Sequence, residues 1–163
     1  MGCVVIIRSS MNRKGFTLIE LVMVIVIIGI IAVYAAPRLG NLTDTKSGAF
    51  VDKLRADIRY AQNLAMTRNQ RYRVYFNGSG GGAPASGYSV VNNATGETAQ
   101  DPAGRGNLIV TLNTGDYTGI TVSTPAGGFI EFNALGAPTA AAVLTIAPGG
   151  QQVTITVQTG AVN

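Results

Sequence analysis

The sequence contains no histidine and no tryptophan, one cysteine (Cys3), and only 12% charged residues. These absences exclude Ser-His and Cys-His catalysis and metal sites built from histidine and cysteine. A single cysteine also excludes an internal disulfide framework. The 47% hydrophobic content is too high for a disordered chain, while the charged share is about half that of an ordinary soluble domain. We therefore expect a membrane segment, a β-rich extracellular body, or both.

The 163 residues suffice for one domain with a core. The formal charge of +4 depends on Arg8, Arg13 and Lys14, which precede a long apolar run. Without residues 1–15, nine basic and eight acidic residues remain. The basic balance therefore indicates a targeting signal and not a nucleic-acid partner.

The apolar run has no charged residue from Leu21 to Ala36, and counted from Phe16 it reaches 21 residues, interrupted only by Thr17 and Glu20. A bilayer core requires about 20 helical residues, so the run is long enough to span it. The basic residues before it predict a cytoplasmic N-terminal side. A buried core helix is disfavoured because the run has no polar face. A secretory signal peptide cleaved after Ala35 and a retained membrane helix stay open.

Glu20 distinguishes these two alternatives. A carboxylate at the bilayer centre costs about 2.5–3.5 kcal/mol, and less near the interface. A signal peptide that is removed would gain nothing from a carboxylate with this energetic cost. Glu20 either reaches the headgroups or pairs with a positive group from another chain. Cleavage after Gly15 would create such a group, because Phe16 would gain an α-amino group one helical turn from the carboxylate of Glu20.

Residues 13–20, Arg-Lys-Gly-Phe-Thr-Leu-Ile-Glu, resemble the class III leader of type IV pilins and type II secretion pseudopilins. The resemblance implies that a prepilin peptidase cuts between Gly15 and Phe16 and that Phe16 becomes N-methylated. It implies an assembly role for Glu20 and a helix kink at Pro37. It also implies, as partners, other pilins or pseudopilins in a helical filament and an inner-membrane assembly platform. The remaining residues of the recognition motif are Lys14, Thr17, Leu18 and Ile19.

This interpretation divides the chain into a leader, residues 1–15, a membrane and assembly helix, residues 16–37, and a periplasmic body, residues 38–163. Met11 is an alternative start that would give the shorter leader usual for the family, and Cys3 would then be lost with residues 1–10. We expect a single-pass inner-membrane protein, with its N-terminus cytoplasmic and its C-terminal body periplasmic, that later enters a periplasmic or surface filament.

A second, amphipathic helix is predicted over about residues 43–68 because apolar residues recur there at spacings of three and four. Read without a break from Phe16 to Met66, one helix would be about 75 Å long, although Gly40 and Asn41 are positioned to bend or loosen it. The stripe consists of Phe50, Leu54, Ile58, Ala61, Leu64 and Ala65. Lys53, Arg55, Arg59 and Arg68 lie off it, together with Asp52 and Asp57.

From residue 71 the hydrophobic period changes to two, which predicts strands. Residues 71–77 and 87–92 are expected to pair across a glycine-rich loop that lacks the features of a phosphate-binding loop. Further strands are expected at 108–112, 120–123, 129–133, 143–147 and 153–158, the last two joined by a turn at 148–150.

This order of elements resembles the GspH/FimT branch of the pseudopilins. It implies an α+β fold, in which a long N-terminal helix, membrane-spanning in its first half and amphipathic in its second, packs on an antiparallel β-sandwich-like domain. No carboxylate cluster follows Glu131 and no disulfide is available, which favours a minor subunit.

A basic segment, residues 46–73, carries seven basic and two acidic side chains, a net charge of +5. A solvated helix face explains it. The alternative is a nucleic-acid contact through Arg68, Arg71 and Arg73. FimT-like pilins that bind DNA use arginines near the C-terminus, whereas here no Lys or Arg follows Arg105. The sequence therefore disfavours nucleic acid as a partner.

The sequence as a whole predicts a structural subunit, not an enzyme, with no cofactor and no metal site. The preferred function is that of a minor pseudopilin in a type II secretion pseudopilus that supports protein export. The alternatives are a minor type IV pilin serving adhesion, twitching or DNA uptake, and a soluble periplasmic binding protein released by signal peptidase.

Overall fold

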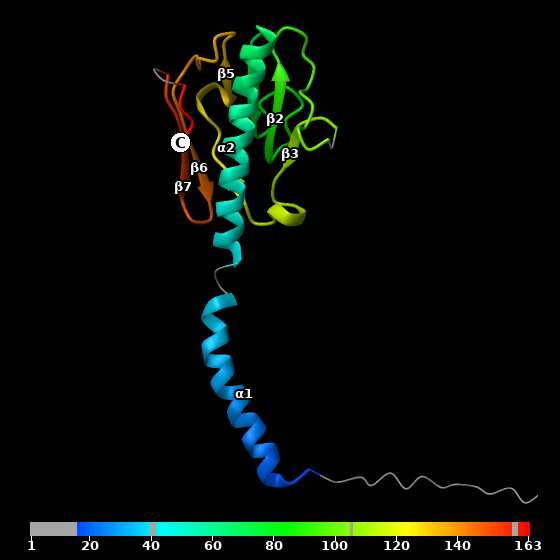
Figure 1. The fold of residues 1–163 in the computed structure, drawn as a ribbon, viewed down its shortest axis with the longest axis vertical. Coiled ribbons are helices and arrows are strands. Elements are labelled where there is room, and N and C mark those ends of the chain that lie inside the picture. The colour runs from blue at the N-terminus through cyan, green and yellow to red at the C-terminus, as the bar shows by residue number, and fades with distance from the viewer. Residues whose placement is uncertain (1–15, 40–41, 105, 158–159) are drawn as a thin grey trace, which may run out of the picture. The chain divides into compact units, whose positions relative to one another are not determined.

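The computed structural model describes residues 16–39, 42–104, 106–157 and 160–163. The chain divides into two compact units, Met1–Gly40 and Asn41–Asn163. In the first unit the structure describes one helix, α1, Leu18–Leu39. The second unit, which we call the body, contains α2, Leu42–Arg68, and all the strands (Figure 1). The sequence also allowed one unbroken helix; residues 40–41, where α1 and α2 would join, lie outside the described residues.

Helix α2 forms because its apolar residues recur on one side, and that side is buried. Phe50, Leu54, Ile58 and Ala61 are all 0% exposed, which confirms the predicted stripe. The helix ends where Asn69 takes a left-handed conformation, φ 51°. The amide of Asn69 donates to the carbonyl of Met66 and that of Gln70 to the carbonyl of Ala65. This pair of hydrogen bonds is a Schellman motif, a common end of a helix.

The first sheet has the strand order β3-β2-β1-β5 and is antiparallel throughout. The predicted pairing across the glycine-rich loop is confirmed, with Tyr72 opposite Asn92 and Phe76 opposite Tyr88. Strand β5 joins the far side of β1, so that Arg73 faces Glu131. The strands are β1 Tyr72–Phe76, β2 Gly87–Asn92, β3 Ile109–Thr111 and β5 Phe129–Phe132.

The second sheet has the order β4-β6-β7, with strands β4 Thr121–Val122, β6 Ala142–Ala147 and β7 Gln151–Ile155. The hairpin between β6 and β7 is confirmed, and its turn lies at the predicted Pro-Gly-Gly. Strand β7 starts two residues before the predicted range, 153–158, and ends within that range, at Ile155. The predicted strand began at the first apolar residue, Val153, whereas the backbone already pairs at Gln151, opposite Ile146.

Both sheets supply the core of the body together with α2. The helix contacts β1 and β5 of the first sheet and β6 and β7 of the second. The fully buried side chains include Tyr72 and Phe76 from β1, Tyr88 from β2 and Leu144 from β6. The predicted α+β fold, a helix on antiparallel sheets, is confirmed.

Candidate assembly site at the N-terminal helix

The first turn of α1 is organised by two residues of the leader-like motif. The backbone N–H of Glu20 donates to Thr17 Oγ1 at 3.3 Å, and the N–H of Leu21 donates to the carbonyl of Thr17 at 3.2 Å. Thr17 therefore caps the helix, with Glu20 three residues later, in the spacing of a capping box. A carboxylate in the first turn also interacts favourably with the helix dipole. Glu20 consequently supports the start of the helix besides any role between subunits.

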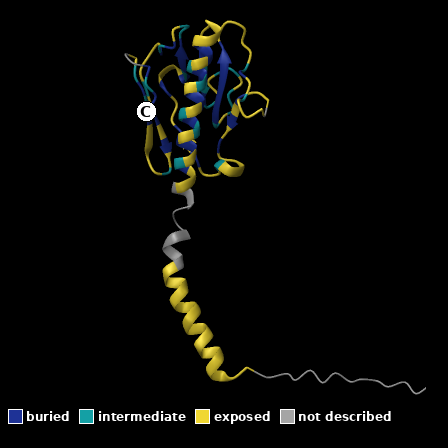
Figure 2. Ribbon diagram, viewed as in Figure 1, coloured by how far each residue is buried: buried dark blue, intermediate teal, exposed yellow. Residues whose placement is uncertain are grey.

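The remainder of this segment presents apolar side chains on every side. The exposed fraction of its large apolar side chains ranges from 40% at Val22 to 80% at Leu18, and residues 16–34 are all exposed (Figure 2). A water-soluble monomer rarely exposes an apolar surface of this extent. The segment therefore requires a partner, either lipid or other helices.

Glu20 is the one charged residue among residues 16–34, and it is exposed. Its neighbours Phe16, Leu18 and Ile19 are 78%, 80% and 64% exposed. Among the described residues, no ion pair to the Glu20 carboxylate is present. Within the described ranges, no helix combines the length and hydropathy needed to cross a bilayer.

Three other predictions about this segment are not decided by the structure. Lys14 and Gly15 lie outside the described residues. Pro37 lies inside α1, which continues to Leu39, so a kink there stays a prediction.

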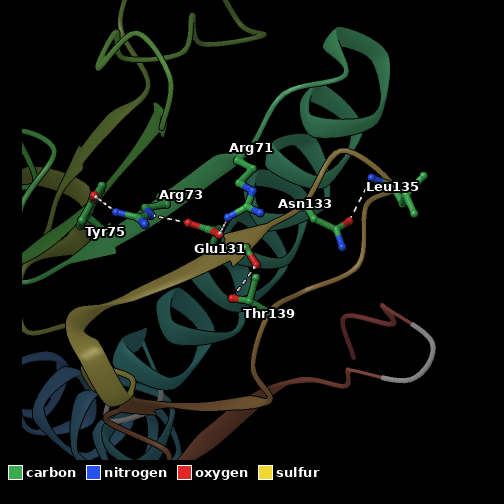
Figure 3. Close-up of polar contacts among 7 residues, drawn as sticks. All are labelled: Arg71, Arg73, Tyr75, Glu131, Asn133, Leu135 and Thr139. Carbon is green, nitrogen blue, oxygen red and sulfur yellow. Dashed lines mark hydrogen bonds and ion pairs between the residues drawn. The ribbon is translucent and has the colours of Figure 1, made fainter.

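The three arginines proposed as a nucleic-acid contact have different surroundings. Arg73 Nε donates to Glu131 Oε2 at 2.6 Å, and Arg71 donates to Glu131 Oε1 at 3.3 Å (Figure 3). The Glu131 side chain is only 6% exposed. Two of the three guanidinium groups are thus neutralised in part by one buried carboxylate, and Arg68, in the last turn of α2, is exposed. The three arginines and Glu131 together keep a net charge of +2, and the Arg71 side chain is 63% exposed, so a nucleic-acid contact stays a prediction.

Arg73 is fixed from three directions. Besides Glu131, it donates to the Tyr75 hydroxyl at 3.1 Å, and its guanidinium lies 4.4 Å from the centre of the Phe129 ring. The hydrogen bonds to Tyr75 and Glu131 raise the pKa of Arg73 above its usual value. Close stacking of this kind stabilises a cation on an aromatic face. We conclude that Arg73 joins β1 to β5 and is a structural residue.

Asp57, which the sequence placed among the solvated charges of α2, is only 5% exposed. Its Oδ2 accepts from the Tyr88 hydroxyl at 2.5 Å and from Lys53 Nζ at 2.7 Å. Burial raises the pKa of Tyr88 well above its usual value, and the nearby charge of Asp57, a smaller effect, raises it further. The placement of Asp57 on the solvent side was therefore wrong, because Tyr88 supplies a buried hydrogen-bond partner.

Comparison with known proteins agrees with this description. The family described as "Type II transport protein GspH" matches residues 51–161, and the "Prokaryotic N-terminal methylation motif" matches residues 10–36. A curated relative, the type IV narrow pilus major component PilA5 of Thermus thermophilus, is 40% identical over 89 residues, covering 52% of this chain and 77% of that protein.

The crystal structure of the type IV minor pilin FimU of Pseudomonas aeruginosa PAO1 has a similar fold. The TM-score is 0.51 at 16% identity, covering 74% of this chain and 88% of the other. That match concerns the fold alone, whereas the sequence matches cover both the methylation motif and most of the body. The chain belongs to the GspH family and is a type IV pilin-like protein of the GspH/FimT kind.

Proposed function

We propose that the protein is a structural subunit of a helical filament, without chemistry of its own, that assembles through α1. One observation carries the proposal: residues 16–34 expose apolar side chains all round and carry a single charge, Glu20, in the first turn of α1. Packing several such helices side by side would cover their apolar surfaces. The carboxylate would then require a cationic partner in each neighbouring contact.

That partner is the α-amino group of Phe16 in an adjacent subunit. Cleavage between Gly15 and Phe16 by a prepilin peptidase creates the amine, and N-methylation keeps it cationic. Phe16 is 78% exposed, and Glu20 is exposed too, so both groups are available to a second molecule. Apolar helix packing alone gives little preference for one axial position over another. The ion pair would therefore select the register between subunits.

Before assembly, the apolar segment holds the subunit in the inner membrane. Arg13 and Lys14 precede the apolar run, and basic residues on one side of such a run favour a cytoplasmic location for that side. The body would then lie in the periplasm. Transfer into the filament exchanges lipid for neighbouring helices, and both surround α1 with apolar groups.

Two filament systems are candidates. The match to the GspH family supports a minor pseudopilin of a type II secretion pseudopilus. The 40% identity to a protein named as a major component of a type IV narrow pilus supports a pilus subunit instead. Deletion of the gene in its native host separates them: loss of exported proteins with surface pili retained indicates secretion, whereas loss of surface pili with export retained indicates a pilus.

Replacement of Glu20 tests the assembly mechanism. In Glu20→Ala and Glu20→Gln, we expect normal recovery in the membrane fraction and at least tenfold less subunit in sheared or purified filaments. Glu97→Gln, which removes an exposed carboxylate of the body, serves as the matched control and should assemble normally. Wild-type incorporation of both Glu20 variants would refute the pairing.

N-terminal sequencing of the mature protein tests the processing step. Phe16 as the first residue, with a methylated amine, supports the proposal. A chain that begins at Ala36 would instead identify a soluble periplasmic protein released by signal peptidase, and the filament proposal would then fail.

A further inference from the structure

The body contains a hollow between the C-terminal half of α2 and the segment that joins β2 to β3, which we call the α2 hollow. Its volume is about 560 Å³, within the range of roughly 300–1,000 Å³ typical of small-molecule sites. Tyr60, Leu64 and Arg68 line it from the helix, and Gln100 and Asn107 line it from the joining segment. The α2 hollow lies wholly within the body.

The wall opposite the helix is fixed in place by hydrogen bonds. The backbone N–H of Asn92 donates to the carbonyl of Glu97 at 2.9 Å, and that of Leu108 donates to the carbonyl of Ala99 at 2.7 Å. The Asn92 side chain donates to Gln70 Oε1 at 2.6 Å. A ligand would therefore enter a preformed site and would lose little free energy to ordering the protein.

The lining of the α2 hollow is polar. Among its described residues two are charged, Arg68 and Glu97, and their signs are opposite. Among the described residues, the exposed amides of Gln100 and Asn107 have no side-chain hydrogen-bond partner within the chain. Each amide supplies both donors and an acceptor. An ionic ligand would meet one like charge, whereas a neutral ligand rich in hydroxyl groups satisfies donors and acceptors together.

The helix side adds an apolar surface. The Tyr60 ring is half-buried against the core, and Leu64 is 8% exposed. A sugar ring combines hydroxyl groups along its edge with apolar C–H groups on its face, and aromatic side chains offer an apolar body with a polar tip. We propose that the α2 hollow binds a neutral saccharide, either a mono- or disaccharide or the terminal residues of a longer glycan.

The test uses the full mature chain in a phosphocholine detergent, because detergents with sugar headgroups would compete. The probes are the methyl glycosides of glucose, galactose and mannose, together with N-acetylglucosamine and lactose, and triglycine serves as a peptide probe. Saturation-transfer NMR detects binding, and titration gives the dissociation constant. We expect at least one saccharide to bind in the millimolar range or tighter and triglycine not to bind.

Gln100→Ala and Asn107→Ala remove exposed amides, so they should fold normally, as circular dichroism would check. Each should weaken saccharide binding about fivefold to tenfold, the effect expected from one lost hydrogen bond. Gln152→Ala removes an exposed glutamine outside the α2 hollow and is the matched control. Three outcomes would overturn the proposal: no binding of any saccharide up to about 10 mM, binding of triglycine alone, or equal binding by all three variants. A dissociation constant of about 10 mM corresponds to a binding free energy of only about −2.7 kcal/mol. Filament assembly does not enter this experiment, so its result is independent of the assembly tests.

Discussion

Replacement of Asp57 by alanine should destabilise the body more than any other loss of a charge on α2. The carboxylate is 5% exposed, and its Oδ2 accepts hydrogen bonds from Tyr88 at 2.5 Å and from Lys53 at 2.7 Å. Asp57→Ala leaves the Tyr88 hydroxyl buried without its partner, since Tyr88 is 0% exposed. It also leaves the half-buried ammonium group of Lys53 without its counter-ion.

The magnitude follows from these two losses. A buried hydroxyl without a partner costs about 1–3 kcal/mol, and breaking a fully buried ion pair costs about 3–5 kcal/mol. The Lys53 side chain is 27% exposed, so water compensates part of the second term. We expect Asp57→Ala to lower the free energy of unfolding by about 3 kcal/mol. Tyr88→Phe, which leaves the Asp57–Lys53 pair intact, should lower it by about 1–1.5 kcal/mol.

Urea unfolding of residues 41–163, followed by far-UV circular dichroism, measures these changes. In the double variant the two losses overlap, so the total should be about 1–2 kcal/mol smaller than the sum of the single effects. Asp52→Ala is the control on the same helix, because the Asp52 side chain is 80% exposed and 3.3 Å from Arg55. It should change the stability by less than about 0.5 kcal/mol. Equal effects of Asp57→Ala and Asp52→Ala, or additive effects in the double variant, would refute the reasoning.

Three further predictions concern the body. Because burial raises the pKa of Tyr88, the folded state retains the hydroxyl proton above about pH 10, whereas the unfolded state loses it. The free energy of unfolding should therefore fall as the pH rises above about 10, by up to about 1.4 kcal/mol per pH unit. Tyr88→Phe should remove this slope in urea titrations between about pH 9 and 11. Glu131→Gln should cost about 1–3 kcal/mol by thermal unfolding, because it removes the charge that two arginines contact, whereas Glu97→Gln, on the surface, should have little effect. Gly87→Ala should lower the free energy of unfolding by more than about 2 kcal/mol, since Gly87 has φ 139° and a Cβ there would collide with the Val110 carbonyl. Its control is Gly96→Ala, at a position with φ 74° and open space around it, which should cost about 1 kcal/mol. Equal losses of stability in the two variants would contradict the steric argument.

Hydrophobic periodicity predicted the elements of the body well, because it reports directly on which residues meet the core. The apolar stripe of α2 is buried from Phe50 to Ala65, and the β1–β2 and β6–β7 hairpins join neighbours in the chain through turns rich in glycine. The leader-like motif likewise lies in consecutive residues. Such local signals need no knowledge of distant contacts.

The features that the sequence did not reveal all depend on contacts between distant residues. Asp57 is adjacent to a core residue of α2, but its partner Tyr88 lies 31 positions later. Glu131 meets Arg73 only because β5 pairs with β1 across 58 positions. The α2 hollow arises where the segment after β2 folds back toward the helix. None of these pairings has a periodicity or a spacing that a single sequence displays.

Helix α2 also binds the last described residues of the chain. Arg59 donates to the carbonyl of Val162 at 2.7 Å, and Gln62 donates to the carbonyl of Gly160 at 3.2 Å, contacts that join positions 103 and 98 apart. These hydrogen bonds are missing until residues 160–162 have been synthesised. A nascent chain that contains all of α2 but not yet this segment would therefore have an incompletely covered helix, and we expect it to remain a substrate for chaperones and proteases until synthesis reaches those positions.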